Sequence, residues 1–160
     1  MYMRTPKYIW QAVALGALAG MRSMAAPALL SHYLSKHPSS NLNGTPMRFM
    51  QYPQVSTATK IMAASEMTGD KMPGIPDRIS PAALAGRTAS GALVAATLFK
   101  AHQDRMVTGA LIGATAAFAA TFGSFYLRKA LAQNTMVKDS VLGMLEDFLV
   151  IRSGLQVMKK

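Results

Sequence analysis

The stretch that decides the fold is Ala17-Leu18-Ala19-Gly20-Met21-Arg22-Ser23-Met24-Ala25-Ala26-Pro27, an arginine in the middle of apolar sequence. Between Tyr8 and Ser35, Arg22 is the only residue certain to be charged at pH 7. About 20 apolar residues span the hydrocarbon core of a bilayer. A charged side chain at such a depth usually faces a protein interior, a partner charge or water. The stretch therefore predicts a membrane-embedded segment with Arg22 directed into the protein.

The same segment carries signals for a break in the helix. Gly20 and Pro27 bracket Arg22, and proline interrupts the hydrogen bonding of a helix interior. At about 1.5 Å of rise per residue, the segment is also longer than one crossing needs. We expect either one tilted, kinked helix or two half-helices that meet at Arg22. Gly16 and Gly20 give it a face of small residues against which another helix can pack.

The composition supports an integral membrane protein. Hydrophobic residues make up 51% of the chain and charged residues 15%, against about 25% charged residues in soluble domains. A soluble, alanine-rich helical bundle is the alternative, and it would need a polar face on each helix. Residues 106–127 contain no charged residue, which argues against that alternative. The sequence favours a single membrane domain over residues 1–160.

The net charge of +10 comes mostly from basic residues near the ends of apolar segments. That placement suits contact with anionic lipid headgroups better than a nucleic-acid-binding surface. The chain has no cysteine and three dispersed histidines, so we expect no transition-metal site and no cofactor. The expected location is the cell inner (plasma) membrane, with several crossings. The expected partner is the lipid bilayer, with a second copy of the chain as a further candidate.

About five apolar segments predict an all-α, polytopic transmembrane bundle. A polar segment rich in proline and asparagine, Lys36 to Ser56, separates the first segment from the second. The second segment is short for a crossing, and Ser80 with Pro81 predicts the N-cap and first turn of the third. The expected segments are Tyr8 to Ser35, Thr57 to Lys71, Ser80 to Lys100, Met106 to Ala132 and Ser140 to Met158.

Two sequence patterns bear on how these segments pack. Small residues recur every four positions in the fourth segment, which predicts a surface for close helix packing, within one chain or between copies. They are Gly109, Gly113, Ala117 and Thr121. Separately, residues 17–22 resemble residues 83–87 with one methionine inserted. The second match raises an internal repeat of three plus three elements, as in many transporters, although four matching residues in an alanine-rich chain also arise by chance.

Eight ionisable residues on or beside the apolar segments form a set whose charges balance when Arg152, near the end of the fifth segment, is left out. Buried charges need partners, because an uncompensated one costs several kcal/mol. Residues 146 and 147 are adjacent, so their side chains point about 100° apart on a helix and cannot both reach one spot. We expect both segment arginines, at 22 and 87, to face the acids at 66 and 70 and one of that adjacent pair. The eight residues are Arg22, Lys71, Arg87, Arg128, Glu66, Asp70, Glu146 and Asp147.

Two functions from different classes follow from this cluster. Ionisable groups inside membranes often mark ion pathways or proton relays, and a helix break beside Arg22 would offer N–H groups to an anion. This favours a transporter or channel, with Glu66 and Asp70 as candidates for proton coupling. The alternative is a structural or accessory membrane protein whose ion pairs only stabilise helix packing. An enzyme is less expected, because no nucleophile or phosphate-binding loop accompanies Glu66-x3-Asp70-Lys71.

The ordered motifs resemble a known family. They cover about Leu15 to Val150 and match, in order, the bacterial membrane-protein family called domain of unknown function 4126. The resemblance implies a multi-helix integral membrane protein and brings no known reaction, ligand or cofactor. The matching pieces are Gly20-Met21-Arg22 with Pro27, Glu66-x3-Asp70-Lys71-x-Pro73, Arg87 with Gly91, Gly109-x3-Gly113 with Arg128, and Ser140 with Glu146-Asp147.

Overall fold

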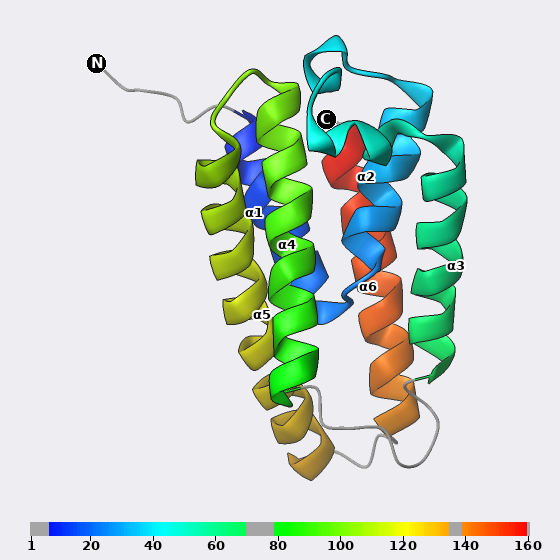
Figure 1. Cartoon of the computed structure of the whole chain (residues 1–160). Coiled ribbons are helices and arrows are strands. Elements are labelled where there is room, and N and C mark those ends of the chain that lie inside the picture. The colour runs from blue at the N-terminus through cyan, green and yellow to red at the C-terminus, as the bar shows by residue number, and fades with distance from the viewer. Residues whose placement is uncertain (1–6, 70–78, 135–138, 160) are drawn as a thin grey trace.

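The computed structural model describes residues 7–69, 79–134 and 139–159, and these residues form an all-α bundle (Figure 1). The predicted all-α class is therefore confirmed. Short 3₁₀ helices occupy part of the polar segment between the second and third helices. The elements are α1 (Lys7–Met21), α2 (Ala25–Lys36), η1 (Ser40–Leu42), η2 (Pro46–Gln51), α3 (Pro53–Gly69), α4 (Pro81–Ala101), α5 (Met106–Asn134) and α6 (Asp139–Lys159).

The first apolar segment folds as two helices that reverse direction at Arg22 (Figure 1). At the start of α1, the Tyr8 hydroxyl donates a hydrogen bond to Asp104 in the turn after α4. Just after α2, the Asn41 side chain donates to the carbonyl of Ala101 at the end of α4. Both ends of the segment thus lie at the same end of the bundle, and α1 and α2 form a hairpin. Of the two alternatives for this segment, the two half-helices hold.

The reversal changes the number of helices that run the length of the bundle. With 15 residues, α1 is about 22 Å long, and it ends part of the way along its neighbours. Within the residues that the structure describes, two helices are long and apolar enough to cross a membrane, α4 and the Met106–Leu131 part of α5. The expected bundle of five transmembrane segments is therefore not confirmed. The physical reason for the difference in the first segment is the return of the chain at Arg22.

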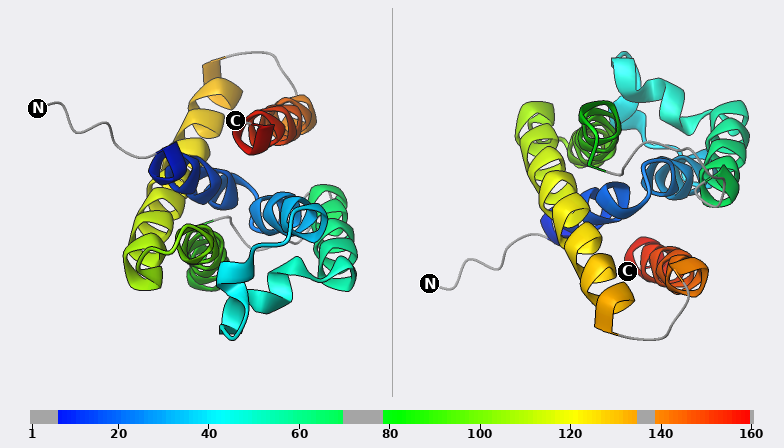
Figure 2. Two further views of the ribbon diagram at one scale, coloured as in Figure 1. Left: turned by 90° about the horizontal axis from the view of Figure 1, so that it is seen from above. Right: turned by 90° about the horizontal axis from the view of Figure 1, so that it is seen from below.

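Helices α1, α4 and α5 pack closely against one another through small residues. A Cβ atom added to Gly113 of α5 would lie 2.1 Å from the carbonyl oxygen of Gly91 in α4, and one added to Gly20 would lie 2.2 Å from the carbonyl oxygen of Ala117. Backbones can approach this closely only where side chains are absent. The predicted small-residue ridge of α5 is thus used within one chain. Seen along the bundle, α1 lies among α2, α4, α5 and α6 (Figure 2).

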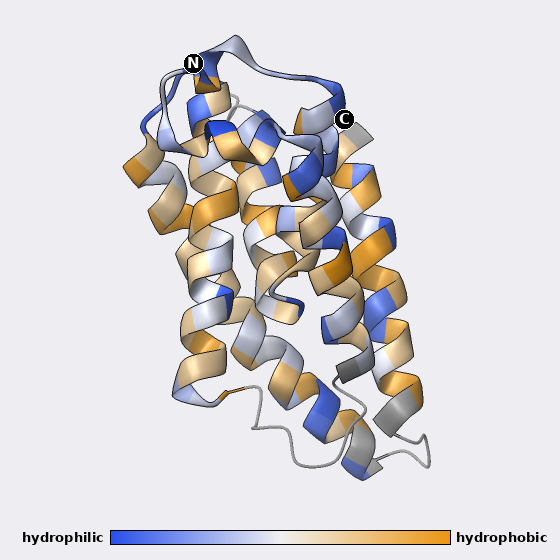
Figure 3. Ribbon diagram, turned by 45° about the vertical axis from the view of Figure 1, so that its right-hand side comes forward, coloured by the Kyte–Doolittle hydropathy of each residue, from blue (hydrophilic) through white to orange (hydrophobic). Residues whose placement is uncertain are grey.

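The start of α4 and the connection between α2 and α3 lie at opposite ends of the bundle (Figure 1). Ser80 caps α4, accepting a hydrogen bond from the backbone N–H of Ala83, as the sequence predicts. In the segment between α2 and α3, Leu42 and Met50 are buried and join the core. The hydropathy colouring in Figure 3 shows that this connection is largely hydrophilic, whereas the helices carry many hydrophobic residues on their visible surface.

Candidate functional site

The hairpin places a helix break inside the bundle. We call residues 20–24, where α1 ends and α2 begins, the tip. Helix ends carry backbone N–H and C=O groups that have no partner within the helix, and inside a bundle such groups are costly unless other groups satisfy them. At the tip, side chains from α3, α4 and α5 supply these partners.

The carbonyl end of α1 faces a buried cation. Arg87 of α4 donates from Nη1 to the carbonyl oxygen of Gly20 at 3.0 Å and to that of Met21 at 3.2 Å. The Thr121 hydroxyl of α5 donates to the same Gly20 oxygen at 3.0 Å. A positive charge near a helix C-terminus is favourable because the helix dipole is negative there. Arg87 therefore stabilises the end of α1 both by hydrogen bonding and by charge.

The amino end of α2 faces a carboxylate. Glu66, near the end of α3, accepts hydrogen bonds at Oε1 from the backbone N–H and the hydroxyl of Ser23, both at 2.9 Å. Its Oε2 accepts from the backbone N–H of Met24 at 2.9 Å. Met24 makes no side-chain cap of its own. The Glu66 carboxylate therefore occupies the position at a helix N-terminus that suits an anion.

Between the two helix ends, Arg22 forms an ion pair with an acid of α6. Its Nε lies 2.7 Å from Oδ1 of Asp147 in α6, and its side chain is 2% exposed. Arg87 and Glu66 complete the group, with Nη2 and Oε1 4.0 Å apart. We call Arg22, Glu66, Arg87 and Asp147 the tip cluster. It joins α3, α4 and α6 to one break in the chain, with two positive and two negative charges.

The other predicted site residues lie elsewhere. Arg128 of α5 pairs with Glu146 of α6, with Nη1 and Oε2 3.7 Å apart. Glu146 and Asp147 thus contact different partners, as their adjacent positions on one helix require. Asp70 and Lys71 lie outside the described residues. Of the eight predicted residues, the structure brings four together at the tip and two into a separate pair.

Sequence reasoning missed the uncharged groups of the site. Ser90 donates from its hydroxyl to the carbonyl oxygen of Ser23, and Thr121 bonds the end of α1. Ser90 follows Arg87 by three residues, so both lie on one face of α4. That spacing was available as a signal, whereas the contact of Thr121 with a main-chain oxygen depends on the packing of α5 against α1.

The acids of the tip cluster are more accessible than the arginines. The Glu66 and Asp147 side chains are 16% and 14% exposed, against 6% for Arg87 and 2% for Arg22. No group of three or more histidine, aspartate or glutamate side chains is arranged to hold a metal ion within the described ranges. The chemistry that this site offers is proton acceptance and ion pairing.

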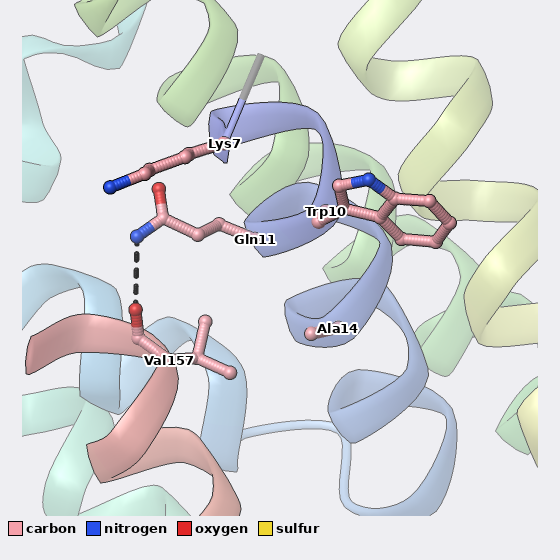
Figure 4. A pocket seen from close by; sticks show the side chains of 5 residues that line it. All are labelled: Lys7, Trp10, Gln11, Ala14 and Val157. Atoms are coloured by element: carbon pink, nitrogen blue, oxygen red, sulfur yellow. Dashed lines mark hydrogen bonds between the residues drawn. The ribbon is translucent and has the colours of Figure 1, made fainter. Parts of the chain in front are cut away.

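The grooves described on the bundle lie away from Arg22. One of about 690 Å³ runs between α1 and the end of α6. In Figure 4, Lys7 and Gln11 extend toward α6, where the Gln11 side chain donates to the carbonyl oxygen of Val157 at 2.9 Å, and Trp10 points away from it. A second and a third groove lie beside α2. None of these three is lined by a member of the tip cluster.

Fold and site together define a small all-α protein built around a charge-paired helix break. The model of the family described as "Domain of unknown function (DUF4126)" matches residues 9–158. The chain belongs to this family, which confirms the resemblance found in the sequence. A search of the curated proteins and a search of the solved structures each found no match.

Proposed function

We propose that the chain is an integral membrane protein in which α3 to α6 cross the bilayer and the hairpin enters and leaves from one side. The observation that carries this proposal is the exposed apolar surface of α5. Only 22% of the most apolar stretch of α5 is buried within the protein, against 50% of the corresponding stretch of α4. Large exposed apolar surfaces are unusual on soluble monomers. Exposed large hydrophobic residues on α5 and α6 include Val107, Leu111, Phe118, Leu127, Met144, Leu145, Phe148 and Leu149.

The distribution of basic residues supports one orientation. In the sequence, the chain ends and connections on the side of the α4–α5 turn carry more lysine and arginine than those on the opposite side. On the opposite side, Arg128 and Lys129 belong to the last part of α5, and the α3–α4 and α5–α6 connections contain Lys71, Arg78 and Lys138. Cytoplasmic ends of membrane proteins are enriched in lysine and arginine. We therefore place the turn, and both ends of the hairpin, on the cytoplasmic side of the inner membrane. The basic residues on that side are Arg4, Lys7, Lys36, Arg48, Lys100, Arg105, Lys159 and Lys160.

The absence of cysteine allows a direct test of insertion and orientation. Two single-cysteine variants, His102→Cys in the turn and Lys129→Cys toward the far end, are expressed in intact cells and treated with a membrane-impermeant maleimide. We expect Lys129→Cys to react from outside and His102→Cys to react only after the cells are opened. Release of the protein from membranes by alkaline carbonate would contradict membrane insertion.

The contacts at the tip best support a structural role for the cluster. Each of its four charged side chains has a partner, and the two helix ends are satisfied by groups of matching charge. In lipid, backbone groups must find their partners within the protein. The cluster would then hold the hairpin closed inside the bundle. On this proposal, the chain is a structural or accessory membrane protein.

Transport is the second candidate, and one observation favours it. Glu66, the anion at the start of α2, comes from α3, and α3 packs mainly against α2 and η2 among the described elements. A helix with few neighbours can move at lower cost than one in the core. Protonation of Glu66 would remove the charge that holds α3 to the tip. A cluster that opens in this way would act as a proton-linked gate.

Proton flux distinguishes the two candidates. The full chain is reconstituted in vesicles that contain a pH-sensitive dye, and a membrane potential is imposed. If the cluster is a gate, the protein conducts protons and Glu66→Gln changes that flux at least tenfold, whereas Glu146→Gln in the separate pair does not. Flux no higher than that of empty vesicles would remove the proton-linked gate and leave the structural role.

A further inference from the structure

A groove in two adjoining parts runs along α2; residues of α6 line both parts, and residues of α3 line the part nearer the tip. Its two parts, of about 440 and 300 Å³, share Leu29, His32 and Leu155. Each wall is a stripe of residues with helical spacing: positions 25, 28, 29, 32 and 36 of α2, 60, 63, 64 and 67 of α3, and 151, 155 and 158 of α6. Residues three and four apart share one helix face, so three helix faces converge on this α2 groove.

The two ends of the α2 groove differ in polarity. Toward the tip, its lining is almost entirely aliphatic, with Ala25, Ala63 and Met67 among the residues. Toward the end of the bundle with the α4–α5 turn, it carries basic and imidazole side chains. Lys60 Nζ lies 2.8 Å from His32 Nδ1, and both residues are among those that line the groove. Lys36 and His37 line the same end.

No acidic side chain is found among the described residues that line the two parts of the groove. Four acids of the described ranges have partners elsewhere: Glu66 at the tip, Asp147 with Arg22, Glu146 with Arg128, and Asp104 with Tyr8. Two lysines therefore adjoin an apolar channel without a carboxylate of the protein. The ligand that fits this arrangement has one anionic end and a long apolar body.

We propose that the α2 groove binds one anionic phospholipid, with its phosphate beside Lys36 and Lys60 and an acyl chain in the aliphatic part. This rests on the proposed membrane insertion. Basic pockets between membrane helices on the cytoplasmic side bind anionic headgroups, and the lysines lie toward the end assigned to that side. The part of the groove near the α4–α5 turn has a volume of about 440 Å³, which is within the range of volumes of small-molecule sites. The lipid would also cover the open side of α2.

Quenching by brominated lipids tests the proposal in the full chain. Trp10, the single tryptophan, lies on the other groove and is changed to phenylalanine, and Leu155→Trp places a reporter in the α2 groove. The protein is reconstituted in phosphatidylcholine vesicles that contain a small fraction of brominated lipid. That lipid is either phosphatidylglycerol or phosphatidylcholine, with identical acyl chains. We expect stronger quenching by brominated phosphatidylglycerol at equal content.

Charge variants identify the headgroup site. Near a membrane surface one basic residue contributes about 1 kcal/mol, so Lys36→Gln and Lys60→Gln should each lower the preference for phosphatidylglycerol about fivefold. Together they should lower it roughly 25-fold. The matched control is Lys100→Gln with Arg105→Gln, which removes two positive charges at the same end of the bundle but outside the groove. The control should keep the preference.

Three results would overturn the proposal. Equal quenching by both brominated lipids means that ordinary bilayer lipid fills the groove. An equal loss of preference in the control and in the lysine variants means that general surface charge causes it. Relief of quenching by inorganic phosphate at low concentration identifies a free-phosphate site instead. If neither brominated lipid quenches the reporter, the membrane insertion itself fails, and this outcome differs from a failure of lipid selectivity.

Discussion

The tip cluster and the Arg128–Glu146 pair use the same side-chain chemistry in different surroundings. Arg22 and Arg87 are 2% and 6% exposed, whereas Arg128 is 20% exposed. At the tip, charged groups bond directly to the ends of two helices, whereas Arg128 and Glu146 join the side chains of α5 and α6. A buried charge is costly to leave alone. The Arg128–Glu146 pair differs from Arg22–Asp147 in its longer N–O distance, 3.7 Å against 2.7 Å, and in its more exposed arginine, although Glu146 itself is 10% exposed. The comparison therefore predicts unequal effects from equal substitutions.

The largest effect is expected from breaking the ion pair at Arg22. Arg22→Met removes the cation and leaves the Asp147 carboxylate in a largely buried place. Removing one partner of a buried pair costs about 3–5 kcal/mol. We expect a loss of this size in the free energy of unfolding, measured by denaturant titration in detergent micelles. Arg128→Met, the matched change in the pair with the longer N–O distance and the more exposed arginine, should cost less.

A double variant separates charge from packing. Replacing both partners of a buried pair by apolar residues is often neutral, because no unpaired charge remains. Arg22→Met with Asp147→Leu should therefore recover most of the stability lost in the single variant. If the double variant is as unstable as Arg22→Met, the arginine acts through its packing, and the ion pair is not the source of the stability.

The second effect concerns the anion at the start of α2. Glu66→Gln keeps the size of the side chain but loses its charge and turns one acceptor oxygen into an amide donor. Hydrogen bonds to charged groups contribute about 1.5–3 kcal/mol, and one of the N–H groups of Ser23 and Met24 would face a donor. We expect faster hydrogen exchange of the amides at the start of α2. Glu146→Gln should leave them protected, and equal loss of protection in both variants would contradict the capping role.

The third effect is that of adding a methyl group at a glycine, compared between Gly20 at the tip and Gly143 beside Arg128. In Gly20→Ala, the new Cβ would lie 2.2 Å from the carbonyl oxygen of Ala117, so α1 and α5 must separate. Overpacking costs about 1–3 kcal/mol. In Gly143→Ala the nearest atom is Arg128 Nη2 at 3.6 Å, an ordinary contact, and alanine favours a helix more than glycine does. We expect a lower unfolding midpoint for Gly20→Ala and an unchanged or higher one for Gly143→Ala.

Much of this comparison could be predicted from the sequence. Arg22 in apolar sequence indicated a break, the small residues from Gly109 to Thr121 indicated a packing surface, and the adjacent acids 146 and 147 indicated two different partners. These predictions depend on local spacing along one helix. Local spacing fixes which side chains share a face, and hydropathy fixes which faces avoid water.

The direction of the chain after Arg22 could not be predicted in this way. A kinked helix and a hairpin have the same local sequence signals, and the choice depends on contacts with residues distant in the chain. Glu66 lies 42 residues from Met24 along the sequence, and Arg87 lies 67 from Gly20. Balanced charges indicated that partners exist, but only the packing of α3 and α4 shows that two of them satisfy main-chain groups.

The smallest effect is expected at the α4–α5 turn, where the charged side chain of Asp104 is half-buried. The backbone N–H of Arg105 and, secondarily, the Tyr8 hydroxyl hold the pKa of Asp104 below its ordinary value. A carboxyl with a lowered folded-state pKa stabilises the fold above its unfolded pKa of about 4, and this contribution is lost as the pH falls further. In Asp104→Asn the unfolding temperature should therefore depend less on pH below about 4. Tyr8→Phe removes only the secondary cause, so its pH dependence should lie between those of the parent and Asp104→Asn. An acid loss of stability in Asp104→Asn as steep as that of the parent would assign the pH dependence to other carboxyls.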